Sequence, residues 1–552
     1  MAELISDYTF PFFRATRDEA KPNVLLLFTD EQRFDTIHAL GAEHMLTPHL
    51  DRLVNEGCTF TRACTPNPVC VAARHSLLTG LYSREHGMAT NNSAVIDPSI
   101  PRLPQMLADD GYQCEEVGKM HFCPARTHHG FHRMQLQEEL YRHIEDDDYA
   151  MYLRAVGLGT IKHVHGIRNP LYWQPQRSLL PEEHHPVTWV GDRACDALRR
   201  LRHRPFFLWS SWIAPHPPLA LPDRYAELYA GADIPAPTPR EEHPNPRLAA
   251  ARRECDYEDP AKTRRMRELY YGAISMVDTQ IGRVLAQLEE IGQLDNTLII
   301  FTSDHGEMLG DNGAWSKCLP NDQAVRIPMI IRYPRRFAPG TRREDYSDLT
   351  DLLPTILDVC GIPYTAAREL PGESLGLAPG TGLKDRSVHY MEHERNAGRV
   401  ISLRGARYKF NYWFADGREE LYDLRADPAE TRNLLQTAMD ADAQAAHALL
   451  KATLTSYEAH YGWPGGVHDG KLHPSPVAAG PIWPPCVAGL DWQMPMHVFN
   501  QLPENATPYQ TDAVEVIEAT RKEPVLQLER LNWEFYLSSG GDVELVEKIR
   551  RQ

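Results

Sequence analysis

The chain has 552 residues, of which 42% are hydrophobic and 24% are charged, and this composition is ordinary for a globular protein with a sizeable core. Its length predicts more than one domain. The formal net charge of −17 argues against a general binder of nucleic acid or of anionic membranes, so an anionic ligand would need a local cationic pocket.

The first twenty residues contain no basic stretch followed by an apolar one, so we expect no signal peptide. The longest apolar runs are far too short to cross a membrane, and no membrane partner is expected. The ten cysteines show no paired spacing. This pattern predicts reduced thiols and a cytoplasmic protein rather than a disulfide framework.

Three apolar runs predict buried strands. Residues 24–28 lead into Asp30, residues 206–212 form a second run, and residues 297–302 are followed by Asp304. Catalytic groups in α/β sheets tend to lie beyond the carboxyl ends of the strands. We therefore expect the two acids to meet at one edge of a sheet, although they are far apart in the chain.

Helices are expected between these strands. Thr47-Pro48 predicts a helix start and Gly57 its end, and residues 272–288 carry apolar side chains at helical spacing. Strands that alternate with helices indicate an α/β fold. Residues 122–190 and 219–265 read as loops that would set substrate specificity.

The chain divides into four predicted regions. Residues 1–21 form a lead-in, 22–385 a catalytic α/β domain and 386–460 a smaller subdomain. Residues 461–552 form an extension, rich in Pro, Gly and Trp in its first half. We interpret the extension as an oligomerisation arm and expect a homo-oligomer.

The most informative stretch is residues 66–80, PNPVCVAARHSLLTG. It predicts a loop that turns into a helix near Val71. Cys70 would then lie at the helix N-terminus, where free N–H groups favour negative charge, and Arg74 would add a cation one turn later. The alternative from these residues alone is a buried core cysteine beside a surface arginine.

Further blocks accompany this stretch in a fixed order: Thr29-Asp30-Glu31, Gly118-Lys119-Met120-His121, Pro215-His216-Pro217-Pro218, Thr302–Glu307, Trp315-Ser316-Lys317, Arg326–Ile331 and Glu420–Asn433. Together they resemble the type I, formylglycine-dependent sulfatases of the alkaline phosphatase superfamily, over roughly residues 22–435. The resemblance implies an α/β fold with a large, mixed but mostly parallel sheet sandwiched by helices. It also implies a smaller C-terminal α+β subdomain.

The same resemblance implies a modified nucleophile. In this family the cysteine of a C-x-P-x-R sequence is oxidised to formylglycine by a formylglycine-generating enzyme, and the hydrated aldehyde attacks the substrate. Cys70 and Arg74 match that sequence, whereas Ala72 stands in the place of proline. The modifying enzyme is therefore an expected partner.

The resemblance also implies a divalent metal site. Its ligands would be Asp30, Glu31, Cys70 in its modified form, Asp304 and His305. Gln32 is the alternative to Glu31. Oxygen-rich donors suit Ca²⁺, Mg²⁺ or Mn²⁺; the family favours Ca²⁺, and the imidazole of His305 keeps Mn²⁺ open.

The expected catalytic residues are Cys70, Arg74, Lys119, His121, His216 and Lys317. Arg74 and Lys119 would hold the hydroxyl and sulfate oxygens, because fixed cations stabilise the charge that develops in the transition state. His216, assisted by Lys317, would stabilise or protonate the leaving group. His121 would take a proton from the nucleophile's second hydroxyl.

The resemblance thus implies hydrolysis of a small-molecule sulfate ester to an alcohol and sulfate. Three alternatives remain open. One is a phosphonate monoester or phosphodiester hydrolase of the same superfamily, and another is a non-catalytic anion- or glycan-binding protein on this scaffold. The third is a cysteine-nucleophile hydrolase, for which no His–Asn partner set is evident. The aromatic residues Tyr141, Tyr149, Tyr152, Tyr172 and Trp173 would line a substrate pocket or would simply pack.

Overall fold

The computed structural model describes residues 21–474, apart from short gaps at 92–94, 140, 142–143, 160, 162–163, 167–171, 242–243, 255–258, 379–385 and 396–397. Nearly all of the predicted lead-in and most of the predicted C-terminal extension lie outside the described residues. The division of the chain into four regions therefore stays a prediction.

An eight-stranded sheet forms the centre of the larger body, in the order β10-β2-β9-β8-β1-β6-β3-β4. All neighbouring strands are parallel except β9, which runs antiparallel to β2 and to β8. The strands are β1 (Asn23–Asp30), β2 (Cys58–Cys64), β3 (Gln113–Gly118), β4 (Arg133–Leu136), β6 (Phe206–Pro215), β8 (Thr297–Ser303), β9 (Met329–Arg332) and β10 (Thr341–Asp348).

The central strand β1 is buried along its whole length, which explains why its sequence is continuously apolar. Successive side chains of a strand point to opposite faces. Leu25 and Leu27 belong to the core on one face of the sheet, and Leu26 and Phe28 to the core on the other. The sheet is therefore covered on both sides.

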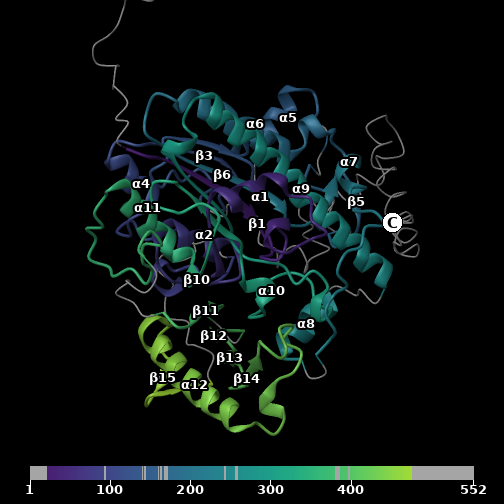
Figure 1. Ribbon diagram of the computed structural model, residues 1–552, viewed down its shortest axis with the longest axis vertical. Coiled ribbons are helices and arrows are strands. Elements are labelled where there is room, and N and C mark those ends of the chain that lie inside the picture. The colour runs from purple at the N-terminus through teal and green to yellow at the C-terminus, as the bar shows by residue number, and fades with distance from the viewer. Residues whose placement is uncertain are drawn as a thin grey trace, which may run out of the picture.

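Helices cover the two faces as separate layers (Figure 1). One layer contains α1 (Pro48–Glu56), α6 (Pro186–Leu201) and the long α9 (Pro260–Glu290). The other contains α2 (Cys70–Thr79), α4 (Leu103–Asp109) and α11 (Leu352–Cys360). Shorter elements complete this body: α3 (Ser83–His86), α5 (Asp148–Ala155), α7 (Asp223–Ala226), α8 (Pro246–Glu254), α10 (Asp322–Val325), β5 (Gln176–Arg177) and β7 (Ala220–Leu221).

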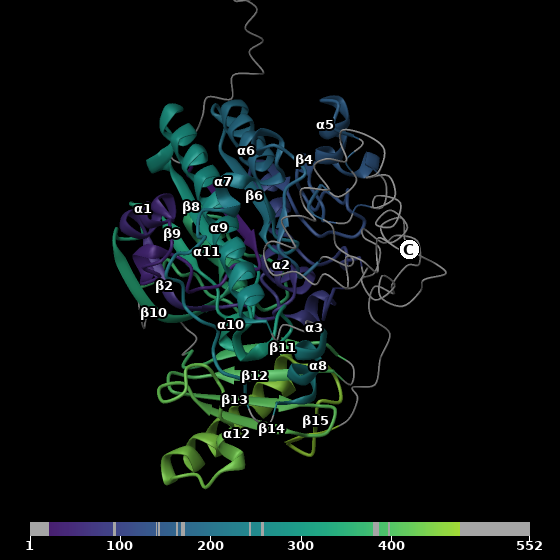
Figure 2. The same cartoon turned by 90° about the vertical axis from the view of Figure 1, so that its right-hand side faces the viewer.

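A second, antiparallel sheet lies below the main body in Figures 1 and 2. It consists of β11 (His389–His393), β12 (Val400–Arg404), β13 (Tyr408–Trp413) and β14 (Glu419–Asp423), and α12 (Ala441–Tyr461) packs against it. The short strands β15 (Val467–His468) and β16 (Lys471–Leu472) follow.

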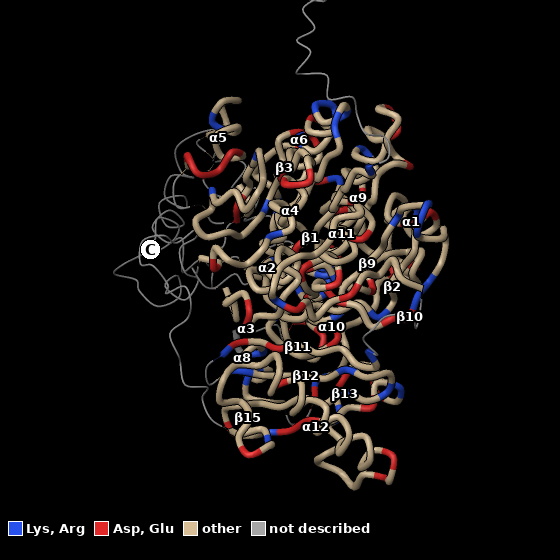
Figure 3. The backbone as a smooth tube through the Cα atoms, turned by 90° about the vertical axis from the view of Figure 1, so that its left-hand side faces the viewer, with Lys and Arg blue, Asp and Glu red and all other residues tan. Residues whose placement is uncertain are grey.

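Buried ion pairs join this sheet to α10 of the main body. Asp322 accepts from Arg404 at 2.8 Å and from Lys409 at 3.0 Å. Figure 3 shows basic and acidic positions next to one another around α10, β12 and β13. Because buried charges need partners, these pairs fix how the second sheet lies against the first.

The predicted fold class is confirmed. The helix expected at 272–288 is part of the longer α9, and the helix expected between Pro48 and Gly57 is α1, although the Thr47 side chain makes no capping hydrogen bond. Residues 219–265, read as loops, include α7 and α8. No helix among the described residues is long and apolar enough to cross a bilayer.

Candidate active site

The two predicted acids meet at the carboxyl edge of the sheet. Thr29 of β1 pairs with Ser303 of β8 in parallel register, so Asp30 and Asp304 leave neighbouring strands at the same edge. The adjacent strand β6 delivers His216 to this edge, and β3 delivers Lys119 and His121. The fold therefore brings together residues that are almost three hundred positions apart.

Cys70 is the first residue of α2 and lies over this edge, as the sequence predicts. All ten residues of α2 are buried, and the first turn is held by Asn91, whose side-chain oxygen accepts from the Val71 N–H at 3.1 Å. Ala72 lies in that first turn and is fully buried. The helix therefore forms here with alanine in place of proline.

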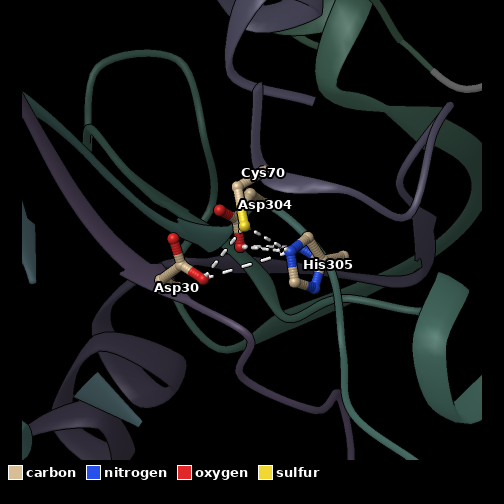
Figure 4. Close-up of side chains that lie close together, drawn as sticks. All are labelled: Asp30, Cys70, Asp304 and His305. Carbon is tan, nitrogen blue, oxygen red and sulfur yellow. Dashed lines mark hydrogen bonds and ion pairs between the residues drawn. The ribbon is translucent and has the colours of Figure 1, made fainter. Parts of the chain in front are cut away.

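The Cys70 Sγ atom points into a cluster of carboxylates and an imidazole (Figure 4). It lies 3.6 Å from Asp30 Oδ1 and 3.2 Å from His305 Nε2. Burial, and then the Asp30 carboxylate, raise the pKa of the Cys70 thiol well above its ordinary value. A cation among these groups would offset their mutual repulsion.

The donor set fits a divalent cation. One donor atom from each of Asp30, Cys70, Asp304 and His305 lies within 4.8 Å of the others. His305 Nδ1 lies 2.9 Å from the Gly306 carbonyl, which accepts a hydrogen bond from the Nδ1–H group and leaves the Nε2 lone pair turned toward the cluster. Metal-binding histidines are oriented in this way by a partner on the other ring nitrogen.

Glu31 lies beside this cluster rather than within it. Its backbone has a φ of 68°, and its Oε2 atom accepts from Lys317 Nζ at 2.8 Å and lies 3.2 Å from His216 Nε2. The Gln32 amide donates to Thr36 Oγ1 at 3.2 Å instead. The choice between Glu31 and Gln32 as a metal ligand stays a prediction.

Arg74 is fully buried and fixed on all sides. It donates to Asp304 Oδ2 at 3.1 Å, to Asp30 Oδ2 at 2.9 Å and to Ser211 Oγ at 2.9 Å. Lys119 is equally buried and lies 2.8 Å from Asp30 Oδ2. Both cations therefore face the proposed ligand carboxylates, which excludes the surface arginine that the sequence left open.

His121 completes the edge at the end of β3. Its backbone is in the left-handed region, with a φ of 64°. Burial, and then the neighbouring Lys119 ammonium, hold the pKa of His121 well below its ordinary value. The imidazole is therefore neutral near neutral pH and able to accept a proton.

His216 and Lys317 form a close pair. Lys317 Nζ lies 2.6 Å from His216 Nε2, and His216 Nδ1 lies 2.6 Å from the Pro217 carbonyl. A carbonyl only accepts, so Nδ1 carries the proton and Nε2 accepts from Lys317. The proton between these two nitrogens therefore belongs to Lys317.

Several supporting residues were not expected from the sequence. Glu139 pairs with Lys119 at 2.8 Å, and Glu138 accepts from the backbone N–H groups of residues 120 and 121. Tyr270 donates to the Glu31 carbonyl at 2.6 Å. These residues belong to none of the sequence blocks that carry the resemblance. Only Glu138 and Glu139 stand out in the sequence, as two adjacent acids.

Two of the aromatic residues in the predicted specificity loops reach the site. The rings of Tyr172 and His216 are 6.4 Å apart, and those of Trp173 and Trp315 are 5.9 Å apart. Tyr149 instead packs against Trp189 at 5.5 Å, in the core between α5 and α6. The loop at 172–173 thus borders the His216–Lys317 pair.

Comparison with known proteins agrees with this geometry. The sequence model of the sulfatase family matches residues 22–362, and that of the N-sulphoglucosamine sulphohydrolase C-terminal region matches residues 310–459. An arylsulfatase of Clostridium perfringens is 30% identical, over 76% of this chain and 91% of the relative.

Two further proteins are similar to this chain. The multifunctional alkaline phosphatase superfamily protein PehA of Trinickia caryophylli is 31% identical, over 75% of this chain and 91% of the relative. The crystal structure of a phosphonate monoester hydrolase of Agrobacterium radiobacter superposes with a TM-score of 0.70 and 25% identity, over 80% of this chain and 96% of the other. With its site residues and its match over most of the described residues, the chain belongs to the sulfatase family.

Proposed function

We propose that this sulfatase hydrolyses sulfate esters with a nucleophile made from Cys70. Sulfate ester hydrolysis follows from the family. The observation that supports the nucleophile is the position of Cys70, buried at the start of α2 and within 3.6 Å of Asp30 and 3.2 Å of His305. A core cysteine has no reason to face two carboxylates, an imidazole and an arginine.

The proposed modification is oxidation of Cys70 to formylglycine by a formylglycine-generating enzyme. Its hydrate supplies one hydroxyl that attacks sulfur and a second hydroxyl whose proton is lost when sulfate is expelled. Ala72, which stands in the place of the motif's proline, is buried in the first turn of α2.

The proposed metal is Ca²⁺, held by Asp30, Asp304, His305 and the modified residue 70, with Mn²⁺ as the alternative because of the imidazole. When bound there, a divalent cation would lower the pKa of a hydroxyl at residue 70 and would offset the charge of the sulfate group. Glu31 offers a further ligand atom, because one of its carboxylate oxygens lies within 4.8 Å of donor atoms of Asp30 and His216, and we propose it as the fifth ligand. It also holds Lys317.

Arg74 and Lys119 are proposed to hold the oxygens of residue 70 and of the sulfate group. Both are fixed before substrate binds, because Asp30, Asp304 and Glu139 hold them. Preorganised cations need no rearrangement as charge develops in the transition state. His121, kept neutral, is proposed to accept the proton that leaves residue 70.

Lys317 is proposed to stabilise the leaving oxygen directly. His216 orients its ammonium from one side and Glu31 from the other. Burial alone would lower the pKa of Lys317, but the Glu31 carboxylate holds it well above its ordinary value. The lysine therefore acts chiefly as a fixed charge, and His216 acts as its positioning partner.

Two wider features, the compartment and the oligomeric state, are also proposed. The eight described cysteines are all free thiols, which agrees with the reducing cytoplasm. A homo-oligomer is proposed because residues 461–552, rich in Pro, Gly and Trp in their first half, are interpreted from the sequence as an oligomerisation arm.

The test compares aryl sulfates with aryl phosphonate monoesters. Relatives of this chain include proteins named for both activities. We expect a higher kcat/KM for the sulfate, together with near-complete loss on Cys70→Ala. A higher kcat/KM for the phosphonate would favour the rival hydrolase, and binding without turnover of either ester would favour the non-catalytic alternative.

A further inference from the structure

A cationic residue of α8 borders the active site and has no part in the chemistry described so far. Arg247 is the second residue of α8, and the next residue, Leu248, packs against Met308 and Leu319 of the segment that follows Asp304. Figure 2 shows α8 beside β11 and β12, at the junction of the two sheets. The helix is thus anchored to the segment that carries Lys317.

The polar partners of the Arg247 guanidinium are neutral. It donates to His393 Nε2 at 3.0 Å, and it lies beside the Cys318 thiol. His393 Nδ1 lies 3.0 Å from Asn67 Oδ1, which accepts a hydrogen bond from the Nδ1–H group. The Nε2 atom can therefore accept a hydrogen bond from Arg247. Burial, and then Arg247, hold the pKa of His393 well below its ordinary value, so this imidazole is uncharged.

Arg247 therefore differs from the catalytic cations. Arg74, Lys119 and Lys317 are each neutralised by at least one carboxylate within 3.1 Å. Among the residues that the structure describes, no carboxylate forms an ion pair with Arg247. A half-buried guanidinium without a counter-ion loses hydration and gains no compensating attraction, unless a ligand supplies the negative charge.

The guanidinium adjoins both walls of the catalytic site. Cys318 follows Lys317 in the chain, and its backbone N–H donates to the Pro68 carbonyl at 3.0 Å. Asn67, the partner of His393, lies three residues before Cys70. Arg247 thus contacts His393, which binds the loop before the nucleophile, and lies beside Cys318, which follows the leaving-group lysine.

We propose that Arg247 binds a second anionic group of the substrate, so that this enzyme prefers sulfate esters carrying a further carboxylate or sulfate. The inference rests on the proposed function. The planar guanidinium presents paired N–H donors that match either anion. The Glu394 carboxylate lies near Cys318 and opposes such binding, so its neutralisation should strengthen it.

The test measures kcat/KM for phenyl sulfate, meta-carboxyphenyl sulfate and resorcinol disulfate. The first carries one negative charge, and the other two add a carboxylate or a sulfate. Arg247→Ala should lower the preference for the two doubly charged esters by about 10- to 100-fold, the usual size of a hydrogen bond to a charged group. Arg247→Lys should restore part of the preference, and Glu394→Gln should increase it.

Arg199→Ala is the matched control, because this arginine is 54% exposed on α6 and its side chain pairs with Asp196 of the same helix. It should leave every ratio unchanged. Calorimetric titration of the same esters into Cys70→Ala enzyme separates the two proposals, because binding does not require turnover. If Arg247→Ala lowers kcat/KM and binding affinity equally for singly and doubly charged esters, the Arg247 assignment is wrong. It is also wrong if neither quantity falls for any ester. Absence of turnover with a retained affinity preference would overturn only the proposed function.

Discussion

At the scale of single residues, the site is a set of charges that hold one another in place. Asp30 touches Arg74, Lys119 and the Cys70 sulfur, and Asp304 holds both Arg74 and the backbone of Glu31. Because the groups are buried, each depends on its partners for its charge state. Removal of one group is therefore expected to change the charge state of its neighbours as well as to remove its own contribution.

Lys317→Ala tests the assignment of the leaving-group cation. We expect kcat/KM to fall by about 10²–10³-fold on an alkyl sulfate, because a fixed charge at the developing oxyanion is lost. The fall should be smaller on para-nitrophenyl sulfate, whose leaving group needs less help.

The matched control is Lys451→Ala, a surface lysine that pairs with Glu419 and is 44% exposed. It should behave as the unmodified enzyme with both esters. An equal loss for the two esters on Lys317→Ala would argue that Lys317 acts in substrate binding and not on the leaving group.

Much of this residue set could be predicted from the sequence, for a physical reason. Asp30 and Asp304 follow continuous apolar runs, and such runs form buried parallel strands whose ends share one edge. The partners Glu138 and Glu139 could not be predicted in the same way, because they follow the short edge strand β4 and reach the site only through the order of strands in space.

At the scale of elements, α8 and the segment before it connect the active-site loop to the second sheet. Glu241 donates its backbone N–H to Asn312 Oδ1 at 2.6 Å, and its side chain lies near Tyr422 of β14. Asn245 donates to the buried Glu420 at 3.1 Å. The sequence predicted a loop here. The helix could not be predicted locally, because the contacts that stabilise α8 come from residues far away in the chain.

Glu241 is expected to make this attachment sensitive to pH. Burial, and then the Glu420 carboxylate, raise the pKa of Glu241 to about 8. A raised pKa means that the folded protein binds this proton more tightly than the unfolded chain. Its contribution to stability is therefore complete at pH values below the ordinary carboxyl pKa and is lost as the pH rises through about 8.

Urea unfolding between pH 6 and pH 8 measures the effect. The free energy of unfolding should fall by up to about 1.4 kcal/mol per pH unit from this group, and Glu241→Gln should remove that slope. A slope that is the same in both proteins would contradict the assignment.

At the scale of the whole molecule, the large sheet carries the site residues and the second sheet packs against the body that contains them. The ion pairs of Asp322 with Arg404 and Lys409 join the two, and His393 of β11 reaches the loop that carries Cys70. The architecture was predictable from the order of blocks in the sequence. The closeness of β11 to the nucleophile was not, because nothing in the local pattern of residues 389–393 marks them as part of the site.

Removal of the metal should act on the whole fold. Without a cation, the carboxylates of Asp30 and Asp304 face each other in a buried cluster. A chelator should abolish turnover and lower the melting temperature, since an ion present at a hundred times its Kd stabilises the folded state by about 2.7 kcal/mol. Ca²⁺ should restore both, and recovery with Mn²⁺ alone would identify the other ion; an unchanged melting temperature and rate would argue against a resident metal.

The most direct test of the central claim is the chemical state of residue 70 in active enzyme. The tryptic peptide from Ala63 to Arg74 contains both Cys64 and Cys70, so Cys64 serves as an internal reference for an unmodified thiol. After alkylation, mass spectrometry should show one alkylated cysteine at position 64 and an aldehyde at position 70, in a fraction that rises and falls with specific activity. Two alkylated cysteines in fully active enzyme would contradict the formylglycine mechanism.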